Sequence, residues 1–148
     1  MDEGRSPQPQ LTRRLVLHRP ADAVTRCRDF TRRALTEWHW PPGPAERGTP
    51  GAEAAEDVLL MVSEVVANAC LHTSGPTSLV LRCTDGRLRI EVTDGSPVAP
   101  VRHRPDPARP GGHGLLIVER LGRDWGWVAV DGGKCVWVEI DSPWTPNL

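Results

Sequence analysis

Several features that would place the chain in a special class are missing from its 148 residues. No apolar run approaches the roughly 20 residues that a membrane-spanning helix needs. Residues 1–10 are polar and contain proline, so they lack the apolar segment of a signal peptide. The formal net charge is -1, which gives no indication of a basic nucleic-acid-binding surface. We therefore expect a cytoplasmic protein that binds neither membranes nor nucleic acid directly.

Disulfide and zinc-binding patterns are also lacking. The four cysteines, Cys27, Cys70, Cys83 and Cys135, form no Cys-x-x-Cys pair and have no histidine at zinc-finger spacing. Reduced thiols are the expected state, with Cys70 and Cys135 in apolar surroundings. Lysine is nearly absent, since Lys134 is the only one among 18 basic residues. We interpret that bias as an effect of genome composition rather than as a binding device.

What the chain does have is a regular succession of helix and strand patterns. Alternation and turn residues predict strands at 11–17, 78–84, 88–93, 125–130 and 134–140. Apolar residues at helical spacing predict helices at 21–38, 52–72 and 114–121. These elements form one domain, 11–141, between a flexible N-terminus at 1–10 and an irregular tail at 142–148.

Two connections stand out by composition. Residues 41–51 are rich in proline and glycine and are expected to form a loop. Residues 96–112 contain five prolines and three arginines and are too long for an ordinary connection. Loops of that length are usually lids or binding segments, so we expect a lid there.

Polar residues recur at every fourth position of the helix expected at 52–72. Glu64, Asn68 and His72 therefore project from nearly the same side. An asparagine amide oxygen is a hard ligand that suits Mg²⁺, and a carboxylate one turn away could accept a proton from a hydroxyl or orient a water. Taken alone, this helix is better explained by a polar face in solvent.

Asp94 ends an alternating strand and is followed by Gly95. An ionised carboxylate only accepts hydrogen bonds, which fits the exocyclic amine of adenine and disfavours the carbonyl of guanine. Gly95 permits a close approach or a positive φ. An ordinary Asp-Gly turn explains the pair equally simply and is favoured when the pair is taken alone.

A glycine-rich segment, Gly111 to Gly114, precedes the apolar residues that begin at Leu115. Glycines at a helix start let backbone N–H groups approach phosphate oxygens, and the helix dipole adds to the attraction. Arg109 or His113 could add a donor to the phosphates. A flexible helix entry is an equally good explanation of this segment alone. A Walker A loop is excluded, because no Gly-Lys-Ser/Thr follows.

In their order and context, the three segments resemble the N, G1 and G2 boxes of the Bergerat ATP-binding fold, which histidine kinases, gyrase B and MutL share. The strings E-V-V-A-N-A-C-L-H-T, D-G-S-P and G-H-G-L-L-I-V-E-R-L are most similar to those of anti-sigma factor serine kinases and stand-alone actinobacterial ATP-binding regulators. The likeness covers residues 11–140. Two positions depart from it: Ser96-Pro97 replaces the second glycine of the fuller G1 box, and His113 stands where arginine is frequent.

The resemblance implies a role for each matching residue. Asn68 would hold Mg²⁺ against the ATP phosphates, and Glu64 would be the catalytic carboxylate. Asp94, with Gly95 beside it, would recognise adenine. The remaining candidate nucleotide-binding residues lie near the phosphates: His72, Arg109, Gly112, His113, Gly114 and Leu115.

The fold implied is α+β: a two-layer α/β sandwich with a mixed, mostly antiparallel sheet and helices on one face. The implied function is phosphorylation of a serine or threonine of an anti-sigma factor antagonist with Mg-ATP, and sequestration of a sigma factor, in a chain that could form a homodimer. An ATP-binding interaction module without phosphotransfer is the alternative, and both readings use the same ATP-site residues. Intact Glu64, Asn68 and Asp94 disfavour a third reading, in which the boxes are vestigial.

Overall fold

The structure, a computed structural model, describes residues 11–42, 50–84, 86–100 and 114–142. Three predicted features lie partly or wholly outside these residues: the flexible N-terminus, most of the lid, and the tail from 143 onward. Arg109, Gly112 and His113 also lie outside the described residues.

The described strands form one five-stranded sheet in the order β1-β2-β3-β5-β4. Their bounds are β1 (Leu11–Val16), β2 (Pro76–Thr84), β3 (Arg87–Asp94), β4 (Asp124–Val130) and β5 (Gly133–Asp141). All neighbouring pairs among them are antiparallel. Strands β3 and β4 run in the same direction, but β5 lies between them, so this relation involves no direct parallel pairing.

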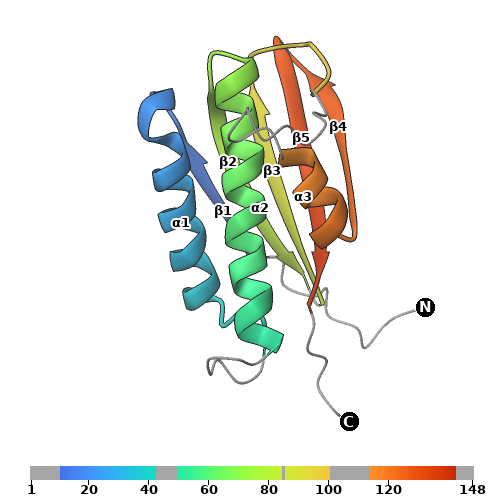
Figure 1. The fold of residues 1–148 in the computed structure, drawn as a ribbon. Helices are drawn as coiled ribbons and strands as arrows, with labels where there is room; N and C mark the ends of the chain where they lie inside the picture. The colour runs from blue at the N-terminus through green and yellow to red at the C-terminus, as the bar shows by residue number, and fades with distance from the viewer. Residues whose placement is uncertain (1–10, 43–49, 85, 101–113, 143–148) are drawn as a thin grey trace, which may run out of the picture.

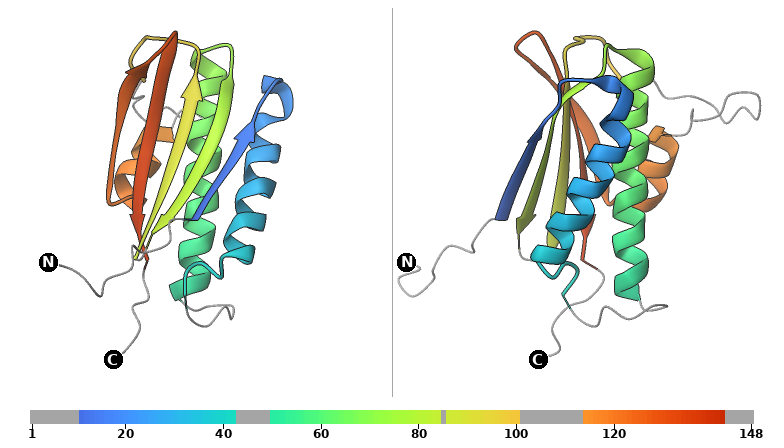
Figure 2. Two further views of the ribbon diagram at one scale, coloured as in Figure 1. Left: turned by 180° about the vertical axis from the view of Figure 1, so that it is seen from behind. Right: turned by 90° about the vertical axis from the view of Figure 1, so that its left-hand side faces the viewer.

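The helices cover one face of this sheet. They are α1 (Ala23–Glu37), α2 (Pro50–His72) and α3 (Gly114–Leu121), and a short 3-10 turn, η1 (Pro20–Asp22), precedes α1. Helix α2 packs against α1 on one side and α3 on the other (Figure 1). Viewed along the sheet, helices and strands form two layers (Figure 2). The predicted two-layer α/β sandwich with helices on one face is confirmed.

Helix α2 is the central element of the helical layer. It begins at Pro50, so Pro50 and Gly51 are helical and the prediction of a loop through residue 51 is wrong at its end. Proline is well suited to the first turn of a helix, where its missing N–H has no intrahelical partner. At the other end, Gly75 adopts φ +109 and donates its N–H to Thr73 Oγ1 at 2.9 Å. That turn ends α2 and starts β2.

Side-chain alternation places the core between the two layers. The buried residues of the central strands are Leu79, Leu81, Leu88, Ile90, Val92, Val136, Val138 and Ile140, and they meet the apolar stripe of α2. The same alternation continues one step further on each of two strands, to Asp94 on β3 and Lys134 on β5. A carboxylate and an ammonium therefore lie on the helix-facing side of the sheet, at the end of the core.

The opposite face of the sheet carries a cluster of charged side chains on its central strands. Arg89 Nε donates to Glu91 Oε2 at 2.8 Å, and the Arg89 guanidinium lies 4.5 Å from the centroid of the Trp137 ring. This ion pair is only partly buried, so its contribution to stability is modest. The buried residues of the sheet thus lie almost entirely on the helix side.

All four cysteines are free thiols. Cys27 on α1 is completely buried, and this burial, reinforced by Cys70 nearby, raises the pKa of its thiol to about 12. Burial also raises the pKa of Cys70 and of Cys135. The thiols of Cys27, Cys70 and Cys135 are therefore weakly reactive, because the thiolate is the reactive form.

Candidate functional site

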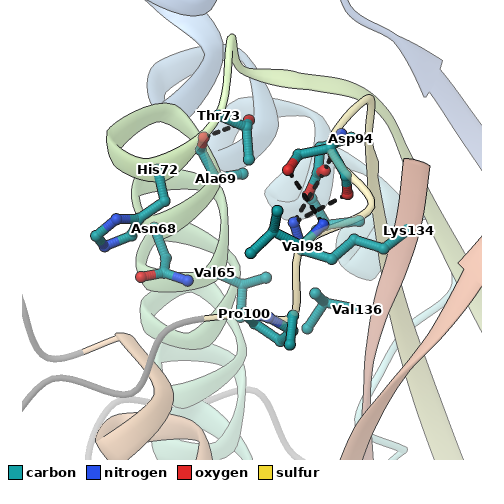
Figure 3. A pocket seen from close by; sticks show the side chains of 13 residues that line it. Val65, Asn68, Ala69, His72, Thr73, Asp94, Val98, Pro100, Lys134 and Val136 are labelled. Atoms are coloured by element: carbon teal, nitrogen blue, oxygen red, sulfur yellow. Dashed lines mark hydrogen bonds and ion pairs between the residues drawn. The ribbon is translucent and has the colours of Figure 1, made fainter. Parts of the chain in front are cut away.

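A cavity of about 110 Å³ lies between helix α2 and the ends of strands β3 and β5 (Figure 3). Its wall includes three residues that the sequence singles out: Asn68, His72 and Asp94. The remaining described lining residues are Val65, Ala69, Thr73, Val92, Ser96, Val98, Ala99, Pro100, Lys134 and Val136. Figure 3 shows Asn68 and His72 on α2, across from Asp94 and Lys134 on the sheet side.

Asn68 is the polar residue that the helix buries most deeply. Its side chain belongs to a residue only 8% exposed, and it makes no hydrogen bond to the described residues. The interpretation of this helix side as a solvated polar face is therefore wrong at Asn68, although His72 one turn later is exposed. The Asn68 side chain lines the cavity, so its amide is available to a ligand bound there.

Asp94 is held by two hydrogen bonds at one of its oxygens. Its Oδ1 accepts from the Ser96 backbone N–H at 2.8 Å and from Lys134 Nζ at 3.0 Å. Its Oδ2 accepts none from the described residues. With 2% of the residue exposed, Asp94 is a buried, ordered acceptor at the cavity wall rather than a simple surface turn.

Lys134 is the functional candidate that the sequence analysis missed. The residue is 4% exposed, and its ammonium also lies 3.4 Å from the Ser96 carbonyl oxygen. Lysine is seldom buried without a partner. The signal was present in the sequence, because Lys134 continues the inward alternation of Val136, Val138 and Ile140 and is the only lysine in the chain.

Glu64 lies one turn before Asn68 and is absent from the described wall of the cavity. Its Oε2 is buried and has no hydrogen-bond partner among the described residues. A carboxylate oxygen in that situation is costly, since it has lost water without gaining a donor. Glu64 therefore lies outside the described wall of the cavity, and its Oε2 has no hydrogen-bond donor among the described residues.

The two glycines around Asp94 have different roles. Gly95 has open space at its Cβ position and no positive φ, so it does not need the conformational freedom that the sequence suggested. Gly133, by contrast, packs against the Asp94 carbonyl so closely that a Cβ would collide with it. The close approach belongs to Gly133 on β5, which the sequence analysis did not single out.

The sequence matches the family described as histidine kinase-like ATPase domain over residues 18–140. The chain belongs to this ATPase family. Membership makes the chain an ATP-binding domain and confirms the family that its motifs resemble. No curated protein matches the sequence.

A solved structure of similar fold is the crystal structure of the RsbU and RsbW domains of Rv1364c from Mycobacterium tuberculosis. The two share 21% sequence identity and superpose with a TM-score of 0.58. The match covers 93% of this chain and only 34% of that one, so this ATPase domain spans a minor part of the other chain. At this identity the likeness concerns the fold alone.

The remaining predicted residues of the ATPase domain are dispersed. Gly114 is the first residue of α3, and Leu115 is 2% exposed and does not line the described cavity. Leu115 therefore packs in the interior, which fits a structural role better than nucleotide contact. The structure tests neither Arg109 nor Gly112 nor His113, because they lie outside the described residues.

The size and ligand set of the cavity limit what it can hold. Ligand sites usually enclose about 300–1,000 Å³, so this cavity accommodates only part of a nucleotide. Within the described residues, no three His, Cys, Asp or Glu side chains cluster as a metal site. A divalent ion bound mainly by phosphates and water needs few protein ligands, and the Asn68 amide fits that requirement.

Among the residues that the structure describes, no helix is both long and apolar enough to span a bilayer.

Proposed function

We propose that the domain is an ATP-dependent regulatory protein kinase that phosphorylates a serine or threonine of a partner protein. The observation that carries this proposal is the convergence of Asn68, His72 and Asp94 on one cavity, with Glu64 a turn away. Each of these residues comes from a motif that resembles a box of the anti-sigma factor kinases. Family membership supports ATP as the phosphate donor.

Asp94 recognises the base in this proposal. Its Oδ2 remains available as an acceptor, because Lys134 Nζ and the Ser96 N–H both donate to Oδ1. A buried carboxylate acceptor favours a base that presents an amine and disfavours one that presents a carbonyl. The cavity would therefore take adenine in preference to guanine.

Asn68 is the residue that would hold Mg²⁺, and Glu64 is the proposed base. Bound Mg²⁺ would neutralise charge on the phosphate oxygens. The Glu64 carboxylate would accept the proton of the substrate hydroxyl. The oxygen of that hydroxyl would form a bond to the γ-phosphorus while the bond between the γ-phosphorus and the ADP oxygen breaks. Gaining that hydroxyl as a donor would satisfy the buried Oε2.

Regulation through protein partners is part of the same proposal. The motif strings are most similar to those of anti-sigma factor kinases, so the expected substrate is an anti-sigma factor antagonist and the sequestered partner a sigma factor. A homodimer would fit the same group. These partners rest on sequence resemblance, because the neighbouring solved structure supports the fold alone.

A second candidate function is an ATP-binding interaction module without phosphotransfer. It is favoured by the position of Glu64, which does not line the described cavity. Both candidates require Asp94 and Asn68, and only the kinase requires Glu64.

Calorimetric titration tests the shared part of both functions. We expect Mg-ATP to bind and Mg-GTP to bind much more weakly, and an Asp94→Asn variant to lose the ATP binding. The matched control is Asp29→Asn, because the Asp29 side chain is 61% exposed on α1, away from the cavity. Absence of ATP binding at millimolar concentration would sink both functions.

Transfer of a radioactive γ-phosphate then separates the two. Candidate anti-sigma factor antagonists from the same genome are incubated with the wild-type protein, and phosphoserine or phosphothreonine is located by mass spectrometry. Labelling that Glu64→Gln abolishes, with ATP binding retained, supports the kinase. Tight ATP binding with no labelled protein in that set supports the interaction module.

A further inference from the structure

The ammonium of Lys134 and the carboxylate of Asp94 form a buried ion pair at the wall of the cavity. The Lys134 side chain is 5% exposed and that of Asp94 is 1% exposed, and Nζ lies 3.0 Å from Oδ1. The two residues are also direct partners in the β3–β5 register, so the backbone fixes their separation. Both line the cavity and both belong to the inward face of the sheet.

Stability alone gives a weak reason for such a pair. Removing two charges from water is costly, and apolar residues of similar size often replace a buried ion pair without loss of stability. The adjacent inward-facing residues, Val92 and Val136, are apolar. Apolar residues in place of the ion pair would therefore continue the hydrophobic core to the ends of the two strands. The pair at this position is therefore better explained by what it does in the cavity.

The hydrogen-bond geometry indicates that task. Lys134 and the Ser96 N–H both bind Oδ1, which fixes the carboxylate orientation and leaves Oδ2 as its available acceptor. The ammonium also offsets the carboxylate charge, so the site presents a directed acceptor to a neutral base and has little attraction for a cation. A buried carboxylate without such a partner would instead attract a cation such as Mg²⁺.

We propose that Lys134 is the positioning residue of the base-recognition site: it holds the Asp94 carboxylate in the orientation in which Oδ2 accepts the exocyclic amine of adenine. This inference rests on the ATP-binding function proposed above. It assigns the selectivity for the amine to the pair rather than to Asp94 alone. Lysine suits the task because it is a compact charge with three donors, whereas the planar fork of arginine is wider.

The test compares two ligands that differ only in the amine. ATP carries it, and purine riboside triphosphate does not. Calorimetry on the wild-type protein should give an affinity for ATP roughly 10- to 100-fold higher, as expected for a hydrogen bond to a charged acceptor. In Lys134→Met, which keeps an unbranched apolar side chain and removes the ammonium, this preference should fall to about twofold or less, while binding of the analogue stays near its wild-type value.

Arg89→Met is the matched control, because Arg89 contributes a positive charge on the outer face of the same sheet, against Trp137. It should keep the wild-type preference. The double variant Asp94→Asn with Lys134→Met leaves no unpaired charge at this position, so we expect it to fold even if Lys134→Met alone unfolds. It should bind ATP no more tightly than the weakly bound analogue.

Three results would overturn the inference. Lys134→Met could keep the wild-type preference for ATP. It could lose affinity for both ligands by the same factor, which would assign Lys134 a purely structural role. The double variant could also retain a preference of the wild-type size. If the wild-type protein binds neither ligand, the proposed function fails first and the inference fails with it.

Discussion

The backbone carbonyl of Asp94, the last residue of β3, occupies the space that a Cβ would need at Gly133, the first residue of β5. This close approach of the two strands accompanies the register that pairs Asp94 with Lys134, whose ammonium reaches the Asp94 carboxylate. The position of Asp94, the proposed base-recognition acceptor, therefore depends on a residue that has no side chain.

Replacing Gly133 with alanine should disturb both stability and ATP binding. The added Cβ would collide with the Asp94 carbonyl, which is backbone and cannot rotate away. We expect a loss of about 1–3 kcal/mol in the free energy of unfolding, as for other overpacked sites, together with weaker ATP binding. Denaturant unfolding and calorimetry measure the two effects.

Gly95→Ala is the matched control for stability. Gly95 has open space at its Cβ position and a φ that alanine can adopt. Its stability should stay within about 0.5 kcal/mol of the wild type or rise slightly. Equal destabilisation by the two substitutions would contradict the assignment of the close approach to Gly133.

Asn68→Ala should remove the magnesium dependence of ATP binding without lowering the stability of the protein. The Asn68 side chain lines the cavity and makes no hydrogen bond to the described residues, so its loss removes none, and alanine is the better helix former. We expect a melting temperature equal to or above that of the wild type. Chelation of Mg²⁺ with EDTA should weaken ATP binding severalfold in the wild type and change it little in the variant. An equally strong EDTA effect in Asn68→Ala would exclude Asn68 as the metal ligand.

Glu64→Gln should separate binding from transfer. The substitution removes the charge from a carboxylate whose Oε2 is buried and unpartnered among the described residues, so we expect no loss of stability. Affinity for ATP should stay within about twofold, because Glu64 does not line the described cavity, while phosphotransfer should fall by a factor of about 100 or more. A fully active variant would show that another group accepts the proton.

The buried thiol of Cys27 predicts a loss of stability at high pH. Burial raises its pKa from 9.0 to about 12. Between these values the unfolded chain releases a proton that the folded chain retains, so stability falls as pH rises, by up to about 1.4 kcal/mol per pH unit. The stabilising contribution is complete below pH 9.0.

Denaturant unfolding of the wild type and of Cys27→Ala between pH 8 and pH 10.5 isolates this effect, because every other titrating group is common to both proteins. The difference in stability between them should shrink or reverse as pH rises. Parallel pH profiles would show that Cys27 is not the group responsible.

Most of the fold could be predicted from local patterns. The strand alternation around Leu88 and Ile90 and the helical spacing of α2 are strong signals, and every predicted element is present in the described residues. The error at Pro50 arose because proline marks both loops and first helical turns. Boundaries of this kind depend on capping, which composition does not determine.

The candidate site was less predictable, because its key contacts join distant segments. The carboxylate of Asp94 meets an ammonium 40 residues later in the chain, and the register of β3 with β5 brings them together. The burial of Asn68 has the same origin, since the residues around Val98 and Pro100 form the other wall of its cavity. The residue pattern of α2 gives no information about the segment that packs opposite it.

The insertion of β5 between β3 and β4 has a consequence for biosynthesis. The last strand of the domain to leave the ribosome fills a central place in the sheet and carries both Gly133 and Lys134. Until it emerges, β3 has one unpaired edge, β4 has no partner among the described strands, and Asp94 has no counter-ion. If Asp94 and Lys134 select the base as proposed, the nascent chain gains this selectivity only when the sheet is complete.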